Sequence, residues 1–282
     1  MASLGTFPKL VEARETLHHA AQLLALVGAS FIEPRGDDSH TSMSWLDPLR
    51  ALVTEPVPAR EPFRIGLCLA RLTLVDFEDG SAEEKASFPL TRRRRADALD
   101  WLRERVEAAG LEPARLHSAL HFSIAKHPTD TDGTFELTDD GSFDELARRY
   151  AQANQLLGEW RLMIAGAGPV RCWPHHFDIA TLVRLPAGGR FETIGVGLSP
   201  GDASFAEPYY YVGPSAVPTV MPRPLTVGYW HTDGWWGGAL TASEIVRRAA
   251  GDDDRPVIRR FIHDATAGLL ESDVGAWQTE HH

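Results

Sequence analysis

The chain has 282 residues, of which 43% are hydrophobic and 24% are charged, and its formal net charge is −11. These values are typical of a globular protein and exclude wholesale disorder, and the length suffices for a hydrophobic core without disulfides or a structural metal. The acidic balance argues against a broad phosphate-binding surface, so we expect no nucleic-acid partner.

The first part of the chain predicts two helices with strands between them. Apolar residues recur at helical spacing over residues 9–29, and Gly28 is the expected end of this helix. Strand-like segments follow at residues 63–80 and 86–91. The second helix is expected over residues 92–111, and we interpret the four arginines at its start as a solvated face.

The remaining elements alternate between strands and helices. Residues 117–135 are ambiguous, with a strand followed by a turn as one interpretation, and residues 142–164 predict a helix. Strands and turns are then expected at residues 169–185, 191–202, 207–214 and 225–241. Residues 243–270 predict a last helix, interrupted at the "GDDDRP" stretch.

The two halves of the chain carry these elements in a similar order. An ungapped alignment places His40 opposite His176 and Leu46 opposite Leu182. Farther along each half, "VDFEDG" precedes "FPLT" and a helix, as "YWHTDG" precedes "GALT" and a helix. We therefore predict an α+β protein of two similar helix-plus-antiparallel-sheet halves, residues 1–138 and 139–282, which form one compact body through internal duplication. The C-terminal half carries the His-His-Phe-Asp strand, close to the expected pseudo-twofold axis.

Cysteine usage and the N-terminus indicate the compartment. Cys68 and Cys172 form no Cys-x-x-Cys pair, so we expect two reduced, buried thiols rather than a disulfide framework. The N-terminus lacks the pattern of a signal peptide, and no run of 18 apolar residues predicts a membrane span. We therefore expect a cytoplasmic protein without a membrane partner; the oligomeric state stays open.

The segment Trp173–Ala180, "WPHHFDIA", is the strongest candidate site. In a strand, His176 and Asp178 project from one face, about 7 Å apart along the strand, while His175 points the other way. Imidazole and carboxylate are ligands of divalent iron or zinc, and His231 is the expected third ligand. Two alternatives stay open: a metal-free polar pocket, and a strand with a purely structural role.

Two other side chains are candidates for catalysis. His40 directly precedes a predicted strand, and Glu207 opens a strand with three tyrosines. A carboxylate close to an imidazole can serve as a general acid or base. A turn with an amphipathic edge strand is the structural alternative for the region around Glu207. No nucleophile elbow or phosphate-binding glycine motif is present in the sequence.

Several short motifs follow one another in a familiar order, among them "ETLHHAAQLL", "DDSHTSMSWL", "LTLVDFEDG", "GVGLSPGD" and "EPYYYV". In this order, from roughly Glu15 to Trp277, the chain resembles bacterial domain-of-unknown-function family 5996. The matching positions are Thr16, Leu17, His18, His40, Phe177, Asp178, Pro200, Gly201 and Pro208. The sequence departs from the family at His175 and His176, and His231 lacks a counterpart. The resemblance implies an architecture but no activity.

These observations support two functional hypotheses. The first is a small-molecule enzyme with a pocket where the His40 and His176 strands approach, in which a divalent metal polarises the substrate or activates water or oxygen. The second is a non-catalytic ligand-binding or protein-interaction module that uses the same pocket. The expected aromatic walls are Trp173, Phe177, Tyr209, Tyr210, Tyr211 and Trp230. The sequence leaves open whether the protein is an enzyme.

Overall fold

The structure is a computed structural model that describes residues 7–117, 119–249, 251 and 253–279. Its helices are α1 (Phe7–Phe31), α2 (Arg95–Ala108), α3 (Asp140–Arg161), α4 (Ala242–Arg248) and α5 (Arg255–Thr279). Its strands are β1 (Ser44–Leu46), β2 (Ala51–Val53), β3 (Phe63–Cys68), β4 (Thr73–Glu78), β5 (Glu84–Pro89), β6 (Arg171–Trp173), β7 (Asp178–Arg184), β8 (Thr193–Ser199), β9 (Tyr209–Pro214), β10 (Tyr229–His231) and β11 (Gly237–Thr241). The strands form two antiparallel sheets, so the predicted α+β class is confirmed.

The chain divides into two compact units. The first unit comprises Pro8–Ala151 with Arg171–Asp178, and the second comprises Gln152–Val170 with the described part of Ile179–His282. The division between residues 138 and 139 that the sequence suggests stays a prediction.

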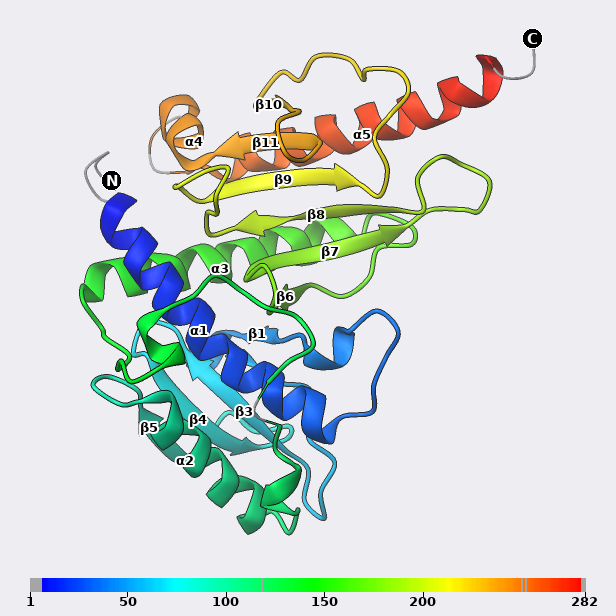
Figure 1. The fold of residues 1–282 in the computed structure, drawn as a ribbon. Coiled ribbons are helices and arrows are strands. Elements are labelled where there is room, and N and C mark those ends of the chain that lie inside the picture. Colours follow the sequence, from blue (N-terminus) through cyan, green and yellow to red (C-terminus); the bar gives the residue numbers. More distant parts are fainter. Residues whose placement is uncertain (1–6, 118, 250, 252, 280–282) are drawn as a thin grey trace. The chain divides into compact units, whose positions relative to one another are not determined.

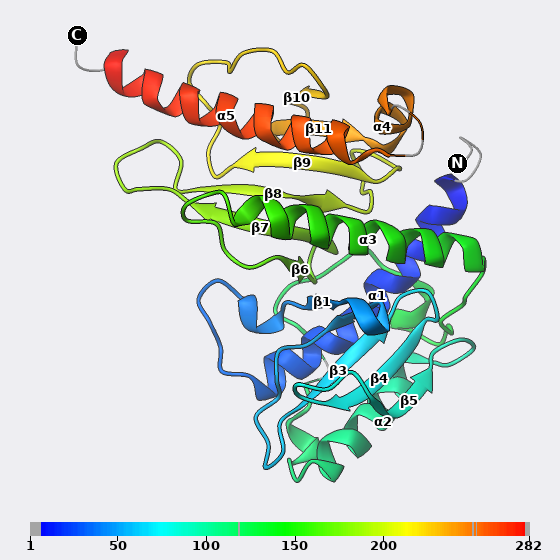
Figure 2. The same cartoon turned by 180° about the vertical axis from the view of Figure 1, so that it is seen from behind.

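The sheet of the first unit follows the chain order β1-β2-β3-β4-β5. Helices α1 and α2 lie along one face of this sheet (Figures 1 and 2). On that face Phe88 stacks on Trp101 of α2, and Phe88 pairs with Leu74 across the strands. Because side chains alternate along a strand, Asp76 shares this helix-facing side with Leu74. A carboxylate therefore stands on the same face as the apolar side chains of Leu74 and Phe88.

The second sheet has the order β10-β11-β9-β8-β7-β6. Helix α5 lies along one face of β9 and β11 (Figures 1 and 2), where the ring of Phe261 covers Gly238. A Cβ atom at Gly238 would lie 3.3 Å from that ring, so glycine permits the close approach of helix and strand. The last helix is interrupted as predicted, because α4 ends at Arg248 and α5 begins at Arg255, inside the "GDDDRP" stretch.

Internal duplication is not confirmed. The alignment of the halves makes the strand of "YWHTDG" the counterpart of the strand of "VDFEDG". In the structure β4 pairs with both β3 and β5, whereas β10 is the outermost strand and pairs with β11. The two strands therefore hold different positions in their sheets.

One local prediction is wrong for a tertiary reason, and the structure decides one ambiguous segment. Gly28 does not end the first helix, which continues to Phe31 with a hydrogen bond from Ile32 N to the Gly28 carbonyl oxygen. Instead, a Cβ atom at Gly28 would lie 2.4 Å from the His40 carbonyl oxygen, so glycine permits the close contact between α1 and residues 40–41. Residues 119–135 form no strand, apart from single bridges at Thr134 and Phe135.

The two cysteines are free and buried, as expected from their spacing. Among the helices in the described ranges, none has a stretch long and apolar enough to cross a bilayer.

Candidate functional site

The segment that carries the two adjacent histidines is a turn and not a strand. Residues 174–177 connect β6 to β7, and both His175 and His176 are exposed. Asp178, the first residue of β7, is buried. The strand alternation expected to place His176 and Asp178 on one face therefore does not apply to this segment.

The turn closes through an unusual backbone conformation at Phe177. This buried residue has a φ of 55°, which is rare for a bulky side chain and therefore carries strain. Its N–H donates to the Trp173 carbonyl oxygen at 2.7 Å, and its own carbonyl accepts a hydrogen bond from the Tyr150 hydroxyl. Burial is the largest cause that raises the pKa of Tyr150 well above its ordinary value, so the phenol remains a neutral donor.

The histidine of the first helix supports the same turn. The ring of His18 stacks on Phe177 with centroids 5.3 Å apart, and its Nε2 donates to the Pro174 carbonyl oxygen at 2.8 Å. Burial lowers the pKa of His18 to about 4, and the nearby His19 and Arg14 add to this effect, against the hydrogen bond to Pro174. His18 is therefore a neutral structural donor at physiological pH.

The candidate acid–base residues both make structural hydrogen bonds. His40 is buried in a short 3-10 helix (Ser39–Thr41) rather than beside a strand, and its Nδ1 accepts from the Arg35 N–H at 3.2 Å. Glu207 lies in the second unit, where its two carboxylate oxygens accept from Ser243 N at 2.6 Å and from Ser243 Oγ at 2.7 Å, at the start of α4. Catalytic roles for His40 and Glu207 stay predictions.

The third expected metal ligand, His231, also lies in the second unit. Its Nε2 donates to the Asp233 carbonyl oxygen at 2.6 Å, and its ring packs against Trp235 and Phe205. Within the described ranges, no group of three or more His, Cys, Asp or Glu side chains is arranged to hold a metal ion. The described residues thus give no support to the expected iron or zinc site of His176, Asp178 and His231, and we assign no chemical step to a metal ion.

The expected aromatic walls fall into two groups. Trp173 and Phe177 belong to the first unit, whereas Tyr209, Tyr210, Tyr211 and Trp230 belong to the second. Trp230 stacks on Trp236 with centroids 5.1 Å apart and also contacts Gly268 of α5, so it packs against its own helix.

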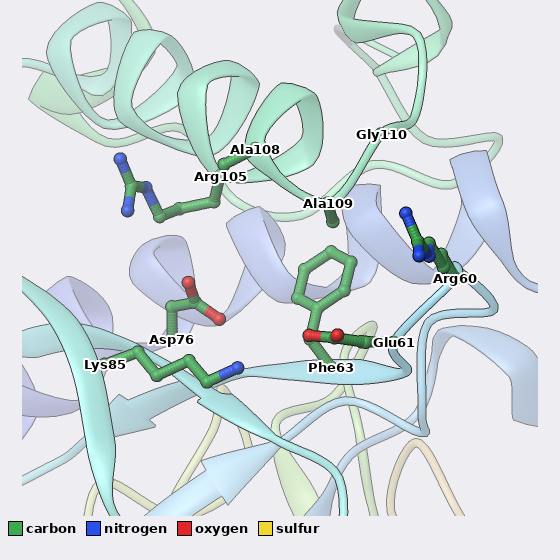
Figure 3. Close-up of a pocket in the computed structure, with 9 residues that line it drawn as sticks. All are labelled: Arg60, Glu61, Phe63, Asp76, Lys85, Arg105, Ala108, Ala109 and Gly110. Atoms are coloured by element: carbon green, nitrogen blue, oxygen red, sulfur yellow. The ribbon is translucent and has the colours of Figure 1, made fainter.

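A pocket of about 470 Å³ lies in the first unit between α2 and the sheet (Figure 3). We call it the α2 pocket. Its lining residues come from four separate segments of the chain and are Arg60, Glu61, Phe63, Asp76, Lys85, Arg105, Ala108, Ala109 and Gly110. This volume lies within the range of small-molecule sites, which span roughly 300–1,000 Å³.

One end of the α2 pocket gathers three charged side chains. The Asp76 carboxylate lies between Arg105 of α2 and Lys85 of β5 (Figure 3). Lys85 is the extra residue of a β-bulge, because Asp76 pairs with Ala86 while Phe77 pairs with Glu84. A bulge re-aims the side chain that it carries, which accounts for the position of Lys85 in the lining.

The charged groups at the Asp76 end of the pocket lack some of their hydrogen-bond partners. Burial raises the pKa of the Asp76 carboxyl, while the charges of Arg105 and Lys85 lower it in part; no hydrogen bond to this carboxylate occurs among the described residues. The Nε of Arg105 is buried and, within the described chain, has no hydrogen-bond partner. Buried polar groups normally find partners, and the partly exposed Asp76 carboxylate is the group at this end that a ligand can reach.

The other end of the α2 pocket is more exposed. The Phe63 ring and Ala109 stand between the Asp76 end and Arg60, and Glu61 extends along the base of Phe63 (Figure 3). Gly110, with a φ of 79°, ends α2 at this point and allows Leu111 N to donate to the Val106 carbonyl oxygen at 3.0 Å. The pocket thus combines an apolar middle with charged groups at both ends.

Sequence reasoning missed the α2 pocket, although two signals were present. Asp76 interrupts the apolar strand "TLVDFE" on the side of Leu74, and Arg105 follows Trp101 by one helical turn beside the buried face of α2. A charged residue at a position where the periodicity expects an apolar one is such a signal.

No family model, curated protein or solved structure matches this chain.

Proposed function

We propose that the protein binds a small organic molecule with an anionic group in the α2 pocket. The observation that carries this proposal is the convergence of Arg60, Lys85 and Arg105 on one pocket with an apolar middle. Of the two functional hypotheses from the sequence, this observation supports the ligand-binding module. Its pocket, however, is formed by other residues than those that the sequence suggested.

The cationic groups are available for a ligand. The guanidinium of Arg105 has its Cζ 5.8 Å from the centre of the Trp101 ring, and its nearest carboxylate oxygen, on Glu104, is 3.9 Å from NH2. Lys85 pairs with Glu78 at 3.3 Å, but both side chains are about half exposed. Exposed ion pairs contribute little stability, so a ligand carboxylate can replace Glu78 at low cost.

Arginine is well suited to bind a carboxylate. Its planar guanidinium presents parallel N–H donors that match the two carboxylate oxygens. We place this binding activity in the cytoplasm, because the two cysteines are free thiols.

Isothermal titration calorimetry with 3-phenylpropionate tests the proposal, since this probe joins a carboxylate to an apolar ring. We expect saturable binding that weakens at least about tenfold, or about 1.4 kcal/mol, in Arg105→Gln and in Lys85→Gln. The matched control is Arg103→Gln on the same helix, where the exposed Arg103 pairs with Asp100 at 2.7 Å outside the pocket. Absence of saturable binding, or equal weakening in the control, contradicts the proposal.

A further inference from the structure

We infer that the ligand of the α2 pocket is an α-amino acid, which carries an ammonium group beside its carboxylate and an apolar side group. This inference rests on the proposed function and adds the identity of the second charge. It follows from the position of Asp76, because a ligand with only an anionic group leaves the Asp76 carboxylate without a hydrogen-bond donor.

Asp76 is a carboxylate without a partner at the inner wall of the pocket. No hydrogen bond or ion pair to it occurs in the described part of the chain, although the charges of Arg105 and Lys85 act on it. A partly buried carboxylate is costly unless it is paired with donors. An ammonium group supplies three N–H donors and the opposite charge, and is therefore the ligand group that best completes this wall.

The arrangement of charges fits one head group. Asp76 lies directly between Arg105 and Lys85 at a single end of the pocket (Figure 3), so an acceptor for a cation and donors for an anion lie side by side. An α-amino acid carries its ammonium and carboxylate on the same carbon atom and presents this pair of charges at one end. A simple acid leaves Asp76 unpaired, and a simple amine leaves the charges of Arg105 and Lys85 without a ligand anion.

The middle of the pocket indicates the side group. The ring of Phe63 stands next to Ala109, and Ala108 also lines the pocket, so these surfaces are apolar (Figure 3). A side group that extends from the head group toward Arg60 passes along them. We therefore expect an apolar side chain, for which burial is favourable.

Calorimetry with three matched probes tests the inference: L-phenylalanine, 3-phenylpropionate, which lacks the ammonium, and 2-phenylethylamine, which lacks the carboxylate. We expect L-phenylalanine to bind at least about tenfold more tightly than either analogue. In Asp76→Asn we expect that advantage over 3-phenylpropionate to vanish. Asp100→Asn, an exposed carboxylate of α2, is the matched control and should preserve it.

The outcomes separate this inference from the proposed function. Equal affinities for L-phenylalanine and 3-phenylpropionate overturn the amino-acid inference and leave an anion-binding pocket in place. Tightest binding of 2-phenylethylamine likewise overturns it. If none of the three probes binds, both the inference and the proposed function fall.

Discussion

Asp76 of β4 and Arg105 of α2 act on each other by charge in the α2 pocket, yet no hydrogen bond joins them among the described residues. Helix α2 packs through Trp101 on Phe88 of β5, the strand that pairs with β4, and the charged pair stands in the pocket between α2 and this sheet. Charged residues that stand where packing favours apolar ones, and that have no hydrogen-bond partner, are commonly functional and lower the stability of the fold.

Asp76→Asn should stabilise the protein at neutral pH. Burial raises the pKa of Asp76 in the folded state, so the folded chain holds this proton to higher pH than the unfolded chain. The contribution of Asp76 to stability is therefore fully present below its pKa in the unfolded chain, about 3.8, and is lost as the pH rises through its pKa in the folded chain. Because the side chain is only partly buried, we expect a gain of up to about 1 kcal/mol.

Urea denaturation of Asp76→Asn and wild type at acidic and neutral pH measures this gain. The difference should be present at neutral pH and shrink toward pH 4. The exposed Asp100→Asn should show no such trend. A variant that is less stable than wild type at neutral pH argues that Asp76 is a structural carboxylate.

The secondary structure could largely be predicted from the sequence because its signals are local. The helical periodicity around Trp101 and the interruption before Arg255 are examples. The turn at Phe177 could not be predicted, since its backbone is held by Tyr150 and His18, which lie far away in the chain. Short segments rich in aromatic residues read as strands when such tertiary contacts are unknown.

The α2 pocket could not be predicted from the sequence for a related reason. Its residues come from a loop, three strands and a helix end, and Lys85 enters it through a bulge that no periodicity reveals. The histidines were conspicuous in the sequence, but His18 and His40 make hydrogen bonds that explain them structurally.

Gly28→Ala should destabilise the protein by roughly 1–3 kcal/mol, the usual cost of overpacking. The new Cβ atom would lie 2.4 Å from the backbone oxygen of His40, which cannot move aside as a flexible side chain can. The matched control is Gly158→Ala in α3, where nothing lies within 4 Å of the new Cβ atom. There we expect a gain of roughly 0.5–1 kcal/mol from helix propensity. Chemical denaturation of both variants gives the comparison, and equal signs contradict the account of Gly28.

Acidification below neutral pH should destabilise the first unit through His18. Its folded pKa of about 4 lies below the unfolded value of 6.5, so its contribution is fully present above 6.5 and is lost as pH falls through 4. We expect His18→Gln, whose amide can still donate to Pro174, to remove about 3 kcal/mol of this pH dependence. The free energy of unfolding of both proteins from pH 7 to pH 4 tests this, with the exposed His263→Gln as control. Parallel curves for wild type and His18→Gln count against it.

Tyr150→Phe should cost about 1–3 kcal/mol, because it leaves the buried carbonyl of Phe177 without its donor. Tyr229→Phe, at an exposed tyrosine, serves as the control and should change stability little. Thermal unfolding measures both effects. A loss of similar size in the two variants means that the Tyr150 hydroxyl does not hold the turn.

The most direct test of the binding proposal is a titration of the isotope-labelled protein with 3-phenylpropionate, followed by amide chemical shifts. The account predicts that the largest shifts fall on residues 60–63, 76, 85 and 105–110, and that Arg105→Gln needs at least about tenfold more ligand to reach them. Shifts centred on the turn at residues 174–177, or no saturable shifts, would contradict the claim that the α2 pocket is the ligand site.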